Sequence, residues 1–291
     1  VSALADEYPN KTVTVITPSH AGNSTDVLTR IVADGLRKKF NNPFVVLNRP
    51  GASGTLGTRE VVRSTKDGYT LLISSSSLTS ALASLKTIPY NVANDITPIS
   101  LIAEAPMGIA VPKGKYKDLK DFVETAKNRK DGMAYGEIGY GLDLHYLSEN
   151  IARLGKFKTV SVPYNDVGGS ITDLIEGRLD FYFATLELLL PLQDKFDILA
   201  LAIDNRSPIA PQIPTFKELG YDITMGVYYP IVGPKNMPAD IKSKIFKAAK
   251  DAMESPAFSN QAKEKGYNLD IKDPELLRKD LWVAYKENGI L

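Results

Sequence analysis

Short apolar runs alternate with segments of helical spacing along the chain. Near the N-terminus, "TVTVIT" (12–17) predicts a strand, "VLTRIVADGLRKKF" (27–40) places apolar residues at helical intervals, and "FVVLN" (44–48) predicts the next strand. A helix over 55–66 and a strand over 70–76 follow. Strands separated by helices indicate an α/β fold with a mostly parallel sheet that is covered on both faces.

The same alternation begins again after residue 96. Extended chain is expected over 96–112, as two runs that meet around Ala105 and Pro106. Further strands are expected over 133–138, 158–164, 179–187, 197–203 and 221–234, and helices over 118–129, 143–155, 170–177, 239–254, 256–265 and 274–287. We interpret this pattern as two Rossmann-like α/β lobes, because the chain is longer than one typical domain.

In this interpretation the chain passes between the two lobes twice. Lobe 1 takes residues 6–100 and 226–291, and lobe 2 takes residues 101–225. We expect the lobes to hinge where few contacts cross, near 99–103 and 223–229.

The charge of the chain is nearly balanced and its cations are dispersed. The 291 residues contain 35 Lys and Arg against 34 Asp and Glu, a formal net charge of +1, and no Cys. A dispersed, balanced charge gives no support to a nucleic-acid surface. Spanning a bilayer takes about 18 consecutive apolar residues, and the sequence contains no such run.

Three loops of small polar residues follow predicted strands. They are "PSHAGNSTD" (18–26), "SSSSLTS" (74–80) and "GEIGYGLD" (136–143). In open parallel sheets, ligands bind outside the carboxyl ends of the strands, and a helix N-terminus offers N–H groups and partial positive charge to an anion. These loops are candidate anion sites, with Ser24, Thr25 and Asp143 as possible N-caps; the alternative is that they are ordinary connections.

Residues suited to catalysis or metal binding are scarce. No GxSxG motif occurs, and the two histidines, His20 and His145, have neither HxxxH nor HxxE spacing. "GEIGYG" (136–141) lacks the GxGxxG spacing of a dinucleotide loop. We therefore expect no catalytic residue, no metal and no cofactor.

Several longer segments resemble one known family in the same order. They are "YPNKTVTVITPSHAGNSTD", "VLNRPGASGTLGT", "STKDGYTLLISSS", "IPYNVANDITPISLIA", "SVPYNDVGGSITDLIEGRLDFYF" and "IPTFKELGYD". The chain resembles, from about Tyr8 to its C-terminal helix, the solute receptors of the tripartite tricarboxylate transporters, the Bug or TctC-like family.

The resemblance implies a type II periplasmic binding protein fold with a ligand cleft between the two lobes. It implies a monomeric, non-enzymatic receptor that captures a small carboxylate-bearing organic acid in the periplasm and delivers it to the membrane permease subunits of the transporter. Residues 1–5, with the small-x-small pattern Ala3 to Ala5, then form the remnant of a removed signal peptide. The alternatives are a ligand-sensing subunit for a membrane signalling partner and an enzyme on the same fold.

The resemblance also implies where the ligand is held. The loops that match Pro18 to Asp26 and Gly136 to Asp143 hold it, and its carboxylate accepts backbone N–H bonds. The residues that we expect to contact the ligand are Ser19, His20, Gly22, Asn23, Ser24, Thr25, Asp26, Ser75, Ser76, Glu137, Gly139, Tyr140, Gly141, Tyr164, Thr185 and Tyr228.

This chain departs from the family pattern in both loops. Ser19, His20, Ala21, Asn23 and Ser24 replace prolines, an aromatic residue and glycines in the first loop, and the second loop carries two carboxylates and several apolar side chains: Glu137, Asp143, Ile138, Tyr140 and Leu142. With Tyr228, the apolar residues predict a less polar cleft than citrate requires. A mono- or dicarboxylate with an apolar or nitrogen-bearing body is therefore expected to bind better than citrate.

Overall fold

The computed structural model describes residues 8–76, 78, 89–138, 143–264, 266–269 and 271. These residues belong to two compact units. Unit 1 comprises Val1–Glu104, Tyr228–Glu264 and Asn268–Leu291, and unit 2 comprises Ala105–Val227 and Lys265–Tyr267. The helix expected over 274–287 and the Ala3 to Ala5 pattern lie outside the described residues.

Unit 1 is built on three parallel strands. In the sheet, β1 (Val13–Thr17) lies between β2 (Phe44–Asn48) and β3 (Thr70–Ile73), and it is parallel to both. β9 (Gly226–Pro234) pairs antiparallel with β3, and the sheet continues through β4 (Ile96–Pro112) to β10 (Asn268–Leu269). The strands that open the chain therefore end together at one edge, where their following loops gather.

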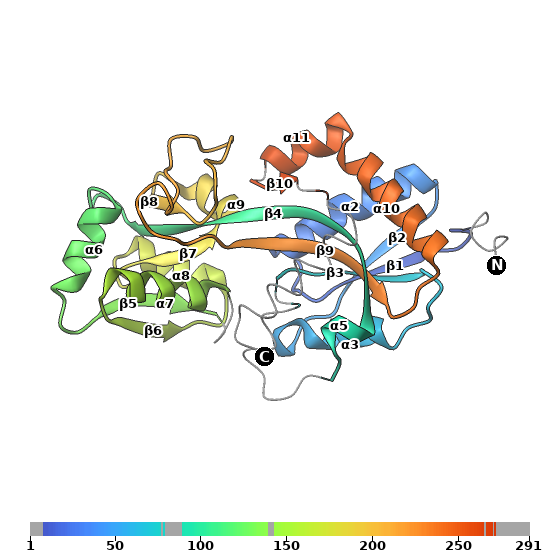
Figure 1. Ribbon diagram of the computed structural model, residues 1–291, viewed down its shortest axis with the longest axis horizontal. Helices are drawn as coiled ribbons and strands as arrows, with labels where there is room; N and C mark the ends of the chain where they lie inside the picture. The colour runs from blue at the N-terminus through green and yellow to red at the C-terminus, as the bar shows by residue number, and fades with distance from the viewer. Residues whose placement is uncertain are drawn as a thin grey trace. The chain divides into compact units, whose positions relative to one another are not determined.

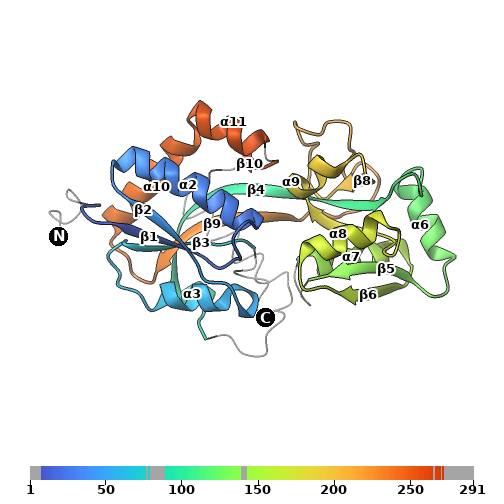
Figure 2. The same ribbon diagram turned by 180° about the vertical axis from the view of Figure 1, so that it is seen from behind.

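Helices cover both faces of this sheet. α2 (Ser24–Phe40), α10 (Ala239–Met253) and α11 (Pro256–Glu264) lie on one face, and α3 (Thr55–Val62) and α5 (Val92–Asp95) lie on the other (Figures 1 and 2). α2 is amphipathic and turns Leu28, Val32 and Leu36 inward, each at most 1% exposed. This burial is the main stabilisation of such a helix.

A left-handed turn carries the chain from β2 into α3. The four residues Gly51, Ala52, Ser53 and Gly54 all have positive φ, between 46° and 120°. Gly57 then allows α3 to approach the end of β1, because a Cβ at this position would lie 3.2 Å from Pro18 Cα. The glycines of "NRPGASGTLG" thus bring the start of α3 to the edge where β1 ends.

Unit 2 combines parallel and antiparallel pairs. β5 (Met133–Glu137) and β6 (Thr159–Pro163) are parallel, and a bridge between Tyr135 and Phe181 places β7 (Tyr182–Thr185) parallel to β5. β7 and β8 (Phe196–Leu201) each pair antiparallel with the end of β4. The helices are α6 (Leu119–Lys127), α7 (Asp143–Gly155), α8 (Val167–Ile175) and the short α9 (Leu186–Leu189), followed by a 3₁₀ turn at Leu190–Leu192.

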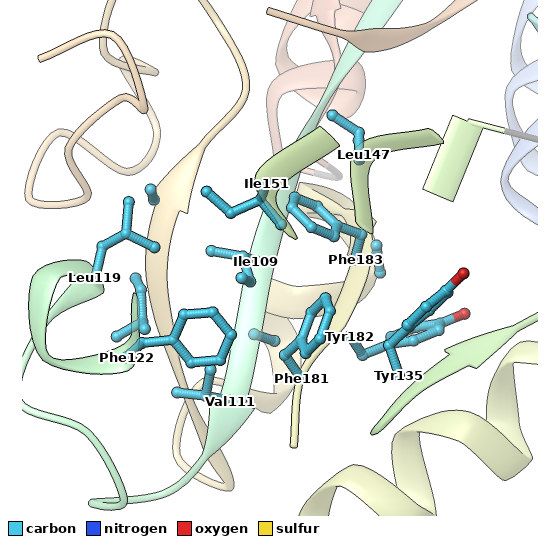
Figure 3. Close-up of a cluster of buried hydrophobic side chains, with 14 of the residues drawn as sticks. Ile109, Val111, Leu119, Phe122, Tyr135, Leu147, Ile151, Phe181, Tyr182 and Phe183 are labelled. Atoms are coloured by element: carbon cyan, nitrogen blue, oxygen red, sulfur yellow. The ribbon is translucent and has the colours of Figure 1, made fainter. Parts of the chain in front are cut away.

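Aromatic rings fill the core of unit 2. Phe122 of α6 meets Phe181 edge to face at a centroid distance of 5.5 Å, and Phe181 meets Phe183 at 6.3 Å (Figure 3). All three rings are fully buried, and Ile109 and Ile151 pack into the same cluster. Edge-to-face pairs add about 0.5–1.5 kcal/mol each beyond the burial of their area.

Three expected strands differ most clearly from the structure. Residues 96–112 form one strand, because Pro106 lies between Ala103–Glu104, which pair with β10, and Met107–Ala110, which pair with β7. A proline at this position removes no N–H from either of those ladders. The strand expected over 179–187 ends at Thr185, where α9 begins, and the strand expected over 221–234 begins only at Gly226.

Asp180 is a buried carboxylate that joins four segments of unit 2. Its Oδ1 accepts from Lys115 Nζ at 2.8 Å and from Arg129 Nη1 at 2.5 Å, and its Oδ2 accepts from the Ala134 N–H at 2.9 Å. Its side chain is 4% exposed. Burial opposes ionisation, but the bonds from Lys115, Ala134 and Arg129 outweigh burial and hold the pKa of Asp180 below its usual value.

We predict that Asp180→Asn lowers the free energy of unfolding by about 2 kcal/mol at pH 7, since charge-assisted hydrogen bonds are lost. A carboxyl group whose pKa is lower in the folded than in the unfolded state stabilises the fold at every pH above the unfolded-state pKa. This stabilisation is lost as the pH falls through the folded-state pKa. The difference between wild type and variant in urea unfolding should therefore be constant above about pH 5 and shrink below the ordinary Asp value of 3.8. Glu124→Gln, which changes an exposed pair with Lys127, is the control and should have little effect. Equal effects of the two substitutions would contradict the prediction.

Candidate functional site

The candidate residues of unit 1 gather at the carboxyl edge of its parallel strands. The loop after β1 contains Ser19 and leads into α2, while Ser75 and Ser76 follow β3. Because Ile16 pairs with Leu72 in parallel register, the two strands end side by side. Tyr228 belongs to the same edge, since the N–H of Ser74 donates to the carbonyl of Pro230 on β9.

The carboxylate of Asp26 organises the loop after β1. Its Oδ2 accepts from the Gly22 N–H at 2.9 Å and from Arg30 Nε at 3.1 Å. Its Oδ1 accepts from Asn48 Nδ2 at 2.8 Å and pairs with Arg30 Nη2 at 3.0 Å. Asn48 Nδ2 also donates to the Ser19 carbonyl at 3.0 Å, so β2, α2 and the loop are held as one hydrogen-bonded group.

Asp26 is 2% exposed, and its ionised form is nevertheless favoured. Burial raises the pKa, but the bonds from Arg30, Gly22 and Asn48 lower it by more, so the pKa of Asp26 lies below its usual value. Arg30 is the cation of this group, and its half-exposed side chain pairs with Asp26 and donates to Asn48 Oδ1.

Gly22 has a different role from the one expected of it. We expected its N–H to be available to a ligand, but this N–H donates to Asp26 inside the loop. Gly22 has φ +85°, a left-handed conformation that glycine adopts without strain. A side chain at this position would strain the loop although no atom lies within 4 Å of the added Cβ, so its substitution does not isolate a ligand contact.

The first turn of α2 is the remaining source of N–H donors. The expected N-caps Ser24 and Thr25 are the first helical residues, and the cap position belongs to Asn23, whose side chain makes no cap hydrogen bond. The apolar spacing begins only at Val27, and the earlier start reflects the polar first turn that helices favour. The first N–H groups of a helix have no partner within it, so those of α2 need partners from outside the helix.

The other expected contact residues of unit 1 differ in exposure. His20 is exposed, and its carbonyl accepts from the Asn23 N–H at 3.3 Å. The hydroxyl oxygens of Ser19 and Thr17 lie 3.1 Å apart. Thr25 and Ser76 are buried, at 8% and 3% exposed.

The expected residues of unit 2 also share one strand edge. Glu137, Tyr164 and Thr185 lie at or directly after the carboxyl ends of β5, β6 and β7, which run parallel. Tyr164 directs its hydroxyl to Asp173 of α8, and burial followed by this bond raises the pKa of Tyr164 to about 12. Gly139, Tyr140 and Gly141 lie outside the described residues.

Glu137 belongs to a hydrogen-bonded network with α7 and β6. Its Oε2 accepts from the Ser161 hydroxyl and lies 3.3 Å from His145 Nδ1. The Tyr135 hydroxyl lies 3.0 Å from the same His145 nitrogen and donates to Glu149 at 2.9 Å. The second expected carboxylate, Asp143, is the first described residue of α7.

Sequence reasoning missed Asn48, Arg30 and Ser161, which hold the candidate residues in place. Arg30 follows Asp26 by four residues, a spacing that predicts their pairing on a helix. Nothing local connects Asn48 or Ser161 to these loops, because both contacts arise from strand pairing.

Grouped metal ligands and membrane-spanning helices are both absent from the described residues. Within 8–138 and 143–271, apart from the gaps given above, no three His, Asp or Glu side chains are grouped as a metal site. No helix of that part of the chain has the length and apolarity needed to cross a bilayer.

Known proteins share this fold. A solved structure described as a periplasmic transporter superposes with a TM-score of 0.87 at 30% identity, covering 97% of this chain and 96% of that one. The Rhodopseudomonas palustris protein Rpa4515 with adipate superposes with a TM-score of 0.88 at 24% identity, covering 97% and 96%. The two-unit α/β fold is therefore that of the periplasmic binding proteins.

Sequence comparison identifies the family. The model for the tripartite tricarboxylate transporter family receptor, TctC, matches residues 28–276. The chain is 31% identical over 280 residues to Protein BugT of Bordetella pertussis, covering 94% of this chain and 86% of BugT. The chain belongs to the tripartite tricarboxylate transporter receptor family, whose members are periplasmic solute-binding proteins.

We predict that Asn48→Ala lowers the free energy of unfolding by about 2 kcal/mol, because the buried Asp26 carboxylate loses a donor and the Ser19 carbonyl is released. Asn42→Ala is the control, since its amide makes comparable bonds to the Lys11 and Pro43 carbonyls at an exposed position. Urea unfolding of both variants measures the difference. If Asn48→Ala and Asn42→Ala had the same free energy of unfolding, the hydrogen bonds around Asp26 would not hold the loop.

Proposed function

We propose that this receptor binds a small carboxylic acid through backbone N–H groups at the start of α2 and delivers it to the membrane permease of its transporter. The observation that carries the proposal is the first turn of α2, whose cap residue Asn23 supplies no side-chain acceptor. A ligand carboxylate satisfies such N–H groups and suits the positive end of the helix.

The Asp26 group supports recognition by N–H groups instead of by a cation. Arg30 pairs with Asp26, which is 2% exposed, and Asp26 accepts from the Gly22 N–H in the loop that precedes α2. A ligand anion then meets preorganised dipoles, and the site needs little rearrangement to bind it.

The apolar side chains near the candidate residues favour a ligand with an apolar carbon body. Tyr228 is partly buried and packs against Leu101 in unit 1, and Ile138 packs at the edge of the unit 2 core. The protein Rpa4515, which has this fold, is described with adipate, a dicarboxylic acid. The proposed ligands are mono- or dicarboxylates with an apolar or nitrogen-bearing body.

The cellular setting is part of the same proposal. In this proposal the chain acts as a monomer, and its partner is a permease rather than a nucleic acid. A sensory subunit for a membrane partner would use the same site. An enzyme on this fold is the remaining alternative, and turnover of a bound acid would establish it.

Binding to the native state raises the unfolding temperature by mass action, so a thermal-shift panel tests the proposal. We expect adipate or a nitrogen-bearing carboxylate to give the largest shift, and citrate a smaller one. A largest shift with citrate or another tricarboxylate would contradict the proposed ligand class. No shift with any carboxylate would contradict the proposed function.

Two variants at Ser24 locate the carboxylate. Ser24→Pro removes the first helical N–H, and proline is tolerated there because Asn23 already has φ −70° and ψ 160°, which suit a residue before proline. Ser24→Ala removes only the hydroxyl. Using the acid with the largest shift, calorimetry should show Ser24→Pro binding at least about tenfold more weakly than Ser24→Ala, the effect of one hydrogen bond to a charge.

We also propose that the two units rotate when the acid binds, about the segments near 99–103 and 223–229. The chain passes from one unit to the other within β4, after Glu104, within β9, before Tyr228, and again on either side of the segment 265–267. Small-angle scattering should show a smaller radius of gyration at saturation with the acid. Identical profiles with and without saturating acid would contradict this rotation.

A further inference from the structure

The hydrogen bonds around Glu137 determine which atoms of Tyr135 and His145 carry a proton. Glu149 Oε1 accepts from the Tyr135 hydroxyl and from the Thr159 hydroxyl, both at 2.9 Å. Tyr135 has then donated its one hydroxyl proton, so its oxygen can only accept from His145 Nδ1 at 3.0 Å. We therefore assign a proton to His145 Nδ1, which faces two acceptors, Tyr135 and Glu137.

The two oxygens of the Glu137 carboxylate differ in their hydrogen bonds. Its Oε2 accepts from both Ser161 and His145, and these two donors fix the orientation of the side chain. Among the described residues, no group donates to Oε1. The Glu137 and His145 side chains remain 12% and 17% exposed, so the pair is not sealed within the core.

The position of Glu137 makes its second oxygen relevant to the ligand. Glu137 is the last residue of β5, at the carboxyl edge that also carries Tyr164 and Thr185. A negative acceptor at this edge attracts an N–H or O–H group and repels a carboxylate. Glu137 therefore favours a ligand group that donates a hydrogen bond.

We propose that Glu137 is a specificity-determining residue that accepts a hydrogen bond from the ligand through Oε1. This inference rests on the proposed function and narrows it. The ligand class becomes carboxylic acids that also carry a hydrogen-bond donor, with a protonated amine preferred to a hydroxyl because it adds charge attraction to the hydrogen bond.

Matched acids isolate the donor group. Succinate, malate and aspartate share one four-carbon dicarboxylate and carry hydrogen, hydroxyl or ammonium at the same carbon, and adipate and 2-aminoadipate form a longer pair. Calorimetry on the wild-type protein should show the amine form of at least one series binding about tenfold or more tightly than its parent, as expected for a hydrogen bond to a charge.

Glu137→Gln should reduce this preference to within about threefold, because an amide oxygen that stays bonded to Ser161 and His145 leaves an NH2 group, which donates and cannot accept, in place of Oε1. The amide oxygen of the variant can still accept from Ser161 and His145, so the network is kept while the charge is removed. The parent acid should bind as well as before or better, because a repulsive carboxylate is gone. Comparable melting temperatures of the free proteins would establish that the variant is folded.

Glu149→Gln is the matched control. It removes a carboxylate from the same network, but from an exposed position on α7 away from the strand edge. The preference for the amine should survive in this variant. If both variants lose the preference equally, the network acts only structurally and the assignment of Glu137 is wrong.

The outcomes separate this inference from the proposed function. If the parent acids bind and Ser24→Pro weakens them, but neither the amine nor the hydroxyl form is preferred, the role of Glu137 is overturned and the carboxylate site stands. If no acid of either series binds, and none of the wider panel does, both are overturned.

Discussion

The candidate site depends on one buried carboxylate that is fully engaged by the protein. Asp26 accepts from the Gly22 N–H, from Arg30 and from Asn48, and these donors come from a loop, a helix and a neighbouring strand. Without them, a carboxylate that is 2% exposed would be strongly unfavourable. Because the group is satisfied, it fixes where α2 begins, and the first turn of α2 is the source of the N–H donors.

The two units contribute different chemistry from equivalent positions. Each places its candidate residues where parallel strands end, as open α/β sheets do. Unit 1 presents donors at a helix N-terminus, whereas unit 2 presents Glu137, an acceptor oriented by Ser161 and His145.

The periodic part of the sequence predicted most of the fold. Strands β1, β2 and β5 and helices α7 and α10 lie within a residue or two of the expected ranges, because each combines a regular apolar pattern with a turn signal at its end. The fold class and the receptor family are confirmed by the structural and sequence comparisons. The joined strand β4 was not foreseen, since only its pairing on either side of Pro106 explains why the chain continues.

The site was harder to predict than the fold, for a physical reason. The small polar loops could be located from the sequence, but the partner of each polar group depends on strand pairing. Asn48 reaches Asp26 from β2, and Ser161 reaches Glu137 from β6, over 22 and 24 residues of sequence. The expectation that Gly22 offers its N–H to a ligand failed for this reason: the acceptor, Asp26, is already supplied by the following helix turn.

A crystal structure of the protein with the acid that gives the largest thermal shift tests the central claim most directly. The account predicts one ligand carboxylate within about 3 Å of backbone nitrogens in the first turn of α2, near Ser24 and Thr25, with the Asp26 and Arg30 pair intact. A carboxylate bound instead to a Lys or Arg side chain, away from the start of α2, would contradict it.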